Sequence, residues 1–180
     1  MSAPRLLIAG VGNVLRGDDG FGIALAHLLQ APGAVPESVR VIETGIGGIS
    51  LVQELMAGYD AFLVLDAVDR GGAPGQLYLL DADVPDVSAL SPIERQSFLA
   101  DLHFANPTRA LMLARAVGVL PPRVSILGCQ SCGHDVFEIG LSDPVREALP
   151  AAVRRVEAWV AGHPGPAPLA PAPRVPAAPS

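Results

Sequence analysis

The stretch that decides the fold is residues 5–29, RLLIAGVGNVLRGDDGFGIALAHLL. Its first seven residues form an apolar run that leads into a glycine-containing loop, which is typical of a strand buried on both faces of a parallel sheet. Its last nine residues, from Phe21 to Leu29, repeat apolar side chains at helical spacing. A buried strand, a loop and a helix in this order predict an α/β domain.

Strand and helix patterns continue to alternate along the chain. Four more short apolar runs predict strands: 39–44, 61–68, 76–80 and 124–127. Helical spacing follows Ser50 and the pair Asn106-Pro107, where we expect Ser50 and Asn106 to cap the helices. A last helix is predicted over 143–162, with a kink at Pro150. We therefore predict a three-layer α/β/α sandwich around a twisted, mainly parallel five-stranded sheet.

The end of the chain differs in composition from the rest. Seven of the 18 prolines fall within the last 19 residues, where alanine is also abundant. Such a segment cannot form a helix or a strand ladder, and it buries too little surface to offset its ordering entropy. We predict one domain over residues 1–162 and a disordered Pro/Ala-rich tail over residues 163–180.

Composition excludes several classes of protein. The formal net charge of −6 argues against nucleic-acid binding. No apolar run approaches the roughly 20 residues that a membrane-spanning helix needs. All 12 basic residues are arginine, which rules out a P-loop lysine, a Schiff-base lysine and a Ser–Lys dyad. With two cysteines and no secretory signal pattern, we expect a cytoplasmic protein.

The loop from Gly10 to Gly22 carries the first candidate site. It begins like a dinucleotide-binding fingerprint, but the position of the third glycine is occupied by Leu15. The loop instead places Asp18 and Asp19 at the start of a helix, where a carboxylate is favoured by the helix dipole. Capping accounts for one acid, Asp18, and we assign a functional role to Asp19.

Two further residues belong to the same predicted edge of the sheet. Asp66 follows a buried apolar run, so it lies where open α/β sheets bind ligands. It needs a cation or hydrogen-bond donors, and the alternative is an aspartate that caps a loop. His103 precedes a predicted helix N-terminus, which favours the neutral imidazole that metals require. A histidine with a purely structural role is the alternative for His103.

The segment Cys129-Gln-Ser-Cys132-Gly-His134 contains a C-x-x-C pair, which is typical of a redox site or half of a zinc site. No second cysteine pair completes a zinc site, so we expect two unpaired thiols without a metal. The chain has neither a G-x-S-x-G elbow nor an H-E-x-x-H motif. The sequence therefore identifies no catalytic nucleophile.

Over about residues 5–160 the chain resembles the nickel–iron hydrogenase maturation endopeptidases. The resemblance rests on motifs in a shared order: Gly10-Val-Gly-Asn13, Asp18-Asp19-Gly20-Phe-Gly22, Leu65-Asp66-Ala67, His103 and Gly140-Leu-Ser142. It implies a twisted sheet flanked by helices. It also implies an enzyme that removes the C-terminal extension of a hydrogenase large-subunit precursor after nickel insertion. Members recognise the nickel centre through two carboxylates and a histidine, which match Asp19, Asp66 and His103 here.

The resemblance implies that the precursor supplies the nickel and, through its own cysteines, the rest of the coordination. Some members carry glutamate at the position of Asp19, whose side chain is one methylene shorter. Two carboxylates and an imidazole suit a borderline divalent metal, which agrees with this role. Two alternatives remain: a non-hydrolytic nucleotide- or small-molecule-binding α/β module, and a redox or zinc protein that acts through Cys129 and Cys132.

Overall fold

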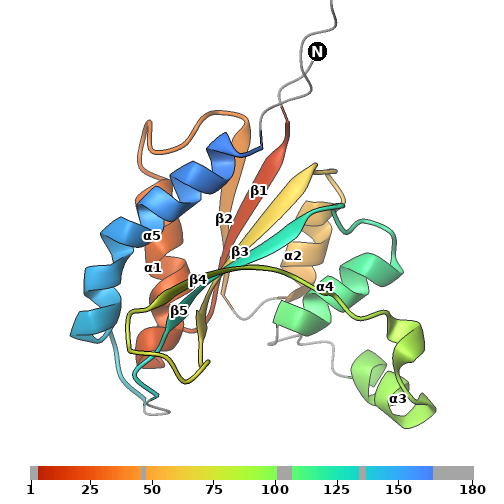
Figure 1. The fold of residues 1–180 in the computed structure, drawn as a ribbon. Coiled ribbons are helices and arrows are strands. Elements are labelled where there is room, and N and C mark those ends of the chain that lie inside the picture. Colours follow the sequence, from red (N-terminus) through yellow and green to blue (C-terminus); the bar gives the residue numbers. More distant parts are fainter. Residues whose placement is uncertain (1–3, 46–47, 101–106, 134–136, 164–180) are drawn as a thin grey trace, which may run out of the picture.

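Strand β1 (Leu6–Val11) is buried along its whole length because strands flank both of its edges and helices cover both of its faces. The structure is a computed structural model that describes residues 4–45, 48–100, 107–133 and 137–163. Parallel neighbours of β1 are β2 (Val39–Gly45) and β3 (Ala61–Val68). Beyond β3 come β5 (Val124–Gln130), which is parallel to it, and the antiparallel edge strand β4 (Leu77–Asp81). The strand order is β2-β1-β3-β5-β4 (Figure 1).

Two helices cover each face of the sheet. Helices α1 (Phe21–Leu29) and α5 (Asp143–Ala161) bury Phe21, Leu25 and Trp159 on one face (Figure 1). Helices α2 (Gly48–Leu55) and α4 (Pro107–Ala116) bury Leu55 and Leu111 on the other. Successive residues of β1 contribute alternately to these two cores, as the pleat of a strand requires. The observed architecture confirms the predicted three-layer sandwich with a mainly parallel five-stranded sheet.

Three local features differ from the sequence-based expectations. Helix α2 begins at Gly48, so the expected cap at Ser50 is wrong, and Ser50 lies inside the helix. Strand β5 continues to Gln130 and therefore includes Cys129. Helix α3 (Pro92–Ala100), which the apolar spacing did not predict, lies beside α4 away from the sheet (Figure 1). Only Phe98 of α3 is buried among the residues whose side chains are described, so the helix carries little apolar periodicity.

Other expectations fall outside the described residues or are partly tested. The expected cap Asn106 lies outside the described ranges, although α4 does begin at Pro107 as predicted. Helix α5 is assigned as one helix that contains Pro150. The predicted tail lies outside the described residues except for His163, so the boundary at residue 162 stays a prediction. No helix among the described residues is both long and apolar enough to cross a membrane.

Two glycines allow α1 to lie unusually close to the sheet. A Cβ on Gly22 would overlap the carbonyl oxygens of Leu65 in β3 and Val11 in β1. A Cβ on Gly10 would overlap the carbonyl oxygen of Gly22 and approach Ala26 Cβ to 2.7 Å. Because these neighbours are mostly backbone atoms, they cannot move aside cheaply. The close crossing fixes where α1 begins, and so where the preceding loop lies.

We expect Gly22→Ala to lower the free energy of unfolding by roughly 3 kcal/mol, because the new methyl group forces α1 away from β1 and β3. Urea denaturation measures the change. The matched control is Gly162→Ala, since a Cβ on Gly162 meets its nearest neighbour at 3.4 Å and its φ is −74°. Equal stabilities for the two variants would contradict the close crossing.

Candidate functional site

The candidate site lies where β1 and β3 end, at the carboxyl edge of the sheet. The loop after β1 forms a short 3-10 turn, η1 (Gly17–Gly20), which contains Asp18 and Asp19 and contacts β3. Asp66 lies near the end of β3. An open pocket at this edge is lined by Arg16, Asp18, Asp19, Ala67, Val68, Asp69, Ser131 and Gly133. Asp66 is not among these lining residues, but it lies close enough to Asp19 for that carboxylate to raise its pKa, so the fold brings the two carboxylates predicted from separate motifs together.

Asp19 is held in place by the glycine turn that precedes it. Gly12 has φ +122°, and a Cβ there would overlap the backbone oxygen of Asp19. The turn lets the backbone N–H of Asn13 donate a hydrogen bond to Asp19 Oδ2 at 2.8 Å. In turn, the Leu15 N–H donates to Asn13 Oδ1 at 2.9 Å. A glycine at position 12 therefore lets the backbone of Asp19 come close to this turn. This packing accounts for the glycine-rich loop although the loop lacks the dinucleotide-binding fingerprint.

The surroundings of Asp66 disfavour the ionised form of its carboxyl group. It is half-buried, and burial together with the nearby Asp19 carboxylate raises the pKa of Asp66 to about 7, against a smaller opposing effect of the Ala67 backbone N–H. Among the described residues, no arginine or histidine forms an ion pair with Asp19 or Asp66. As a free group, Asp66 can take up a proton near neutral pH, whereas a bound cation would keep it ionised.

Asp18 has a different role from its neighbour. It is 9% exposed, and its carboxylate accepts hydrogen bonds from Cys132 N at 2.9 Å, Ser142 N at 2.7 Å and Ser142 Oγ at 3.0 Å. Burial opposes ionisation, but these hydrogen bonds hold the pKa of Asp18 below its usual value. The expectation that Asp18 caps its own helix is wrong, since it ties η1 to the segment between β5 and α5 instead.

Sequence reasoning missed Gln130, which organises the opposite wall of the pocket. Gln130 is 3% exposed, and its Oε1 accepts hydrogen bonds from Arg70 N at 2.8 Å and Gly72 N at 3.3 Å. Its Nε2 donates to Asp69 Oδ1 at 3.0 Å, and this bond helps to lower the pKa of Asp69. The only sequence signal for this role is an amide side chain at the end of an apolar strand.

The two cysteines are free and lie in different surroundings. Cys129 is fully buried in the core beneath α1 and α5, and burial, with smaller effects of Asp18 and Cys132, raises the pKa of its thiol to about 12. Cys132 is partly exposed, and its thiol lies 3.2 Å from Ser142 Oγ. A thiol as buried as that of Cys129 is a poor metal ligand and nucleophile, which agrees with the expectation of unpaired thiols.

The third predicted ligand, His103, lies outside the described residues, as does His134. Within the described ranges, no three His, Cys, Asp or Glu side chains come close enough together to hold a metal ion. Carboxylate oxygens such as those of Asp19 and Asp66 are donors that a divalent metal accepts, and two of them would form only part of a coordination shell.

The raised pKa of Asp66 has a consequence for stability. In the unfolded chain Asp66 ionises near pH 4, whereas in the folded protein it keeps its proton up to about pH 7. The folded state therefore binds more protons between these values, and stability falls as pH rises through this window. We expect the free energy of unfolding of Asp66→Asn, measured by urea denaturation, to rise by about 2–4 kcal/mol relative to that of the unsubstituted protein as the pH increases from 5 to 8.

Asp69→Asn is the matched control for this measurement. Hydrogen bonds from Gln130 and Gly71 lower the pKa of Asp69, so its contribution to stability is lost only as pH falls below about 4. Its stability difference from the unsubstituted protein should stay constant between pH 5 and pH 8. The same constancy for Asp66→Asn would show that Asp66 is ionised in the folded protein.

Comparisons with known proteins point to one family. Residues 23–159 match the family model described as hydrogenase maturation protease. The chain is 36% identical over 154 residues to the hydrogenase expression/formation protein HoxM of Azotobacter vinelandii, a match that covers 86% of this chain and 71% of that protein.

Solved structures agree with this match. The hydrogenase 2 maturation peptidase from Thaumarchaeota archaeon SCGC_AB-539-E09 superposes with a TM-score of 0.64 at 33% identity, covering 87% of this chain and 98% of that one. The [NiFe] hydrogenase maturation protease HycI from Thermococcus kodakarensis shares the fold, with a TM-score of 0.58 at 21% identity over 89% and 94% of the two chains. The chain belongs to the hydrogenase maturation protease family and is an endopeptidase.

Proposed function

We propose that this enzyme removes the C-terminal extension of a nickel–iron hydrogenase large-subunit precursor after nickel insertion. Asp19, Asp66 and His103 recognise the nickel centre of the precursor, and the nickel arrives with the substrate. The Thermococcus kodakarensis structure is named for a [NiFe] hydrogenase, which supports the choice of metal. Nothing in the proposal requires nucleic acid or a membrane as partner.

One observation carries the proposal: the carboxylates of Asp19 and Asp66 lie close together at one edge of the sheet, and no arginine or histidine of the described residues forms an ion pair with either. The pKa of Asp66 is raised to about 7 by burial and by Asp19, so the ionised pair is unfavourable in the enzyme alone. A divalent cation held between the two carboxylates removes the repulsion, because it favours both ionised forms. The pair is thus built to gain stability when a metal-bearing substrate arrives.

The nature of the donor set explains why the metal comes with the substrate. Two carboxylates and one imidazole hold nickel less firmly than thiolates do, and they leave coordination positions open. The precursor fills these positions with its own cysteines, so the nickel bridges enzyme and substrate. An unloaded precursor leaves Asp19 and Asp66 facing each other uncompensated, which disfavours that complex. Cleavage therefore waits until the metal has been inserted.

The hydrolysis itself uses water, since no nucleophile motif is present in the sequence. Water adds its oxygen to the carbonyl carbon of the scissile peptide bond, the C–N bond breaks, and the leaving amine takes a proton that the water has lost. The enzyme positions the bond at the pocket through the nickel contact, and a metal ion next to a carbonyl can also polarise it.

Both alternatives from the sequence lose their support. Membership of an endopeptidase family contradicts a non-hydrolytic nucleotide-binding module. Gly10, Gly12 and Gly22 are also accounted for by close backbone packing rather than by a bound pyrophosphate. A redox or zinc site at the C-x-x-C pair is disfavoured because Cys129 is fully buried in the core.

We expect Asp19→Ala, Asp66→Ala and His103→Ala each to reduce precursor cleavage by roughly 100-fold or more, since each removes a direct nickel contact. For Asp19→Ala and Asp66→Ala the melting temperature should not fall, because both residues lie at the carboxyl edge of the sheet rather than in its core. Asp69→Ala is the control, because it removes a carboxylate from the same pocket without touching the proposed contact. Cleavage at the wild-type rate by all three variants would contradict the assignment of these residues to the site.

We also expect cleavage to depend on nickel in the substrate and the resting enzyme to contain little nickel. The test compares nickel-loaded and nickel-free precursor side by side, after metal analysis of the purified enzyme. Nickel-free precursor should be cleaved at a rate at least roughly 100-fold lower. Equal cleavage of both forms, or stoichiometric metal in an enzyme that cleaves the nickel-free form, would contradict gating by the metal.

A further inference from the structure

Next to the pocket, large apolar side chains face solvent on two neighbouring segments. Leu15 is 42% exposed, Phe137 is 78% exposed and Ile139 is 79% exposed. We call these three residues the apolar strip. Exposed apolar groups that gather in one place mark interaction surfaces more often than those that are scattered singly.

Hydrogen bonds hold the strip in position. The backbone N–H of Glu138 donates to Leu15 O at 3.2 Å, and the Gly17 N–H donates to Glu138 O at 2.7 Å, which forms a parallel bridge between Arg16 and Glu138. A few residues further on, Ser142 is tied to the buried Asp18 by two hydrogen bonds. These backbone hydrogen bonds therefore keep the apolar side chains exposed to solvent rather than packed into the core.

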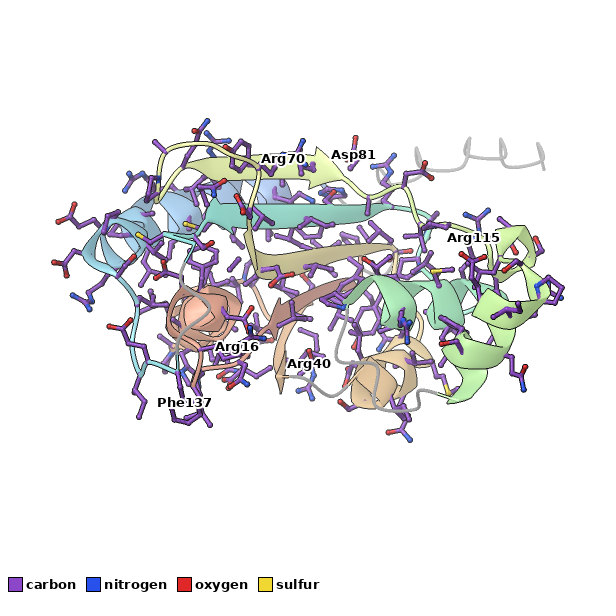
Figure 2. The ribbon with its side chains drawn as sticks, turned by 90° about the horizontal axis from the view of Figure 1, so that it is seen from below. Arg16, Arg40, Arg70, Asp81, Arg115 and Phe137 are labelled. Atoms are coloured by element: carbon purple, nitrogen blue, oxygen red, sulfur yellow. The ribbon has the colours of Figure 1, made fainter. Side chains whose placement is uncertain are left out.

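The strip is continuous with the pocket. Leu15 is followed directly by Arg16, which lines the pocket together with Asp19. Figure 2 shows Arg16 and Phe137 on the same side of the molecule, away from α3. A polypeptide that reaches the pocket from this side has to pass over the strip.

We propose that the apolar strip is the docking surface for the large-subunit precursor, and that it binds an apolar segment of the precursor next to the nickel centre. This inference rests on the proposed function. A protease must hold a polypeptide across its site, and the pocket lining is polar for the most part, with three aspartates, Arg16 and Ser131. The apolar side chains adjoining it supply binding energy that depends little on the charge of the substrate.

Two other occupants are less well placed. The predicted tail starts at the end of α5, a helix of 19 residues that is about 28 Å long. That end lies beside Arg123 and Val124, at the start of β5, and so at the opposite edge of the sheet from the strip. A second copy of the chain would cover the strip but would also obstruct the adjoining pocket.

The test compares two double variants of the full chain. Phe137→Ser/Ile139→Ser removes the most exposed part of the strip. Met56→Ser/Ile93→Ser is the matched control, because Met56, the residue after α2, is 62% exposed and Ile93 on α3 is 81% exposed. Initial rates are measured over a range of concentrations of nickel-loaded precursor, and the affinity for that precursor is measured separately by biolayer interferometry. Melting temperature and oligomeric state are recorded for each protein.

The strip variant should show a KM and a Kd raised roughly tenfold, with kcat changed less than twofold and an unchanged melting temperature. The control should match the unsubstituted enzyme in all of these. An unchanged KM and Kd, or a loss confined to kcat, overturns the docking surface. Two other results also overturn it. If the unsubstituted enzyme is a dimer that the strip variant disrupts, the strip binds a second copy of the chain. If deletion of residues 164–180 lowers KM, the strip binds the tail. If the unsubstituted enzyme binds nickel-loaded precursor without cleaving it, the proposed function fails, and the affinities alone decide the docking surface.

Discussion

The close approach of α1 to β1 and β3 is the constraint on which the site depends. With no Cβ on Gly10 or Gly22, the first turn of α1 rests against the carbonyl oxygens of Val11 and Leu65. Leu65 is the residue before Asp66, so the same contact that seats the helix also sets the distance between η1 and the end of β3. Tight packing at the sheet edge is thus part of what places Asp19 next to Asp66.

The three acids at this edge show how surroundings separate groups of the same chemical type. Asp18 accepts three hydrogen bonds and keeps its charge although it is buried. Asp66 finds no comparable set of donors in the part of the chain that the structure describes, and burial and the nearby Asp19 carboxylate disfavour its charge. Asp18 stabilises the fold, whereas Asp66 makes it less stable above neutral pH. In the function we propose, the site keeps this unfavourable pair because a cation that arrives with the substrate compensates it.

Contacts between distant parts of the sequence build the walls around these acids. Asp18 is 124 residues away from Ser142, and Gln130 is 61 residues away from Asp69. The first connection reaches the segment that follows β5, whose exposed apolar residues adjoin the pocket, and the second reaches the last residue of β5. The same loops therefore shape the pocket and present the strip, which in the function we propose couples recognition of the metal to recognition of the polypeptide around it.

Much of this molecule could be predicted from residue patterns alone. Apolar runs and helical spacing identified the five strands and most helices, because a strand buried on both faces and an amphipathic helix each need a characteristic order of side chains. Motif order indicated the family, and the position of Asp66 after a buried strand indicated the edge of the sheet at which it lies. Helix α3 was not predicted, because a helix that buries few side chains has little apolar periodicity in its sequence.

Only the tertiary structure decided that Asp18 binds Ser142, that Gln130 organises the loop after β3, and that Asp66 holds a proton up to about pH 7. Hydrogen bonds and charge repulsion act over a few ångströms, and no local pattern records which distant residues the folded chain brings within that range.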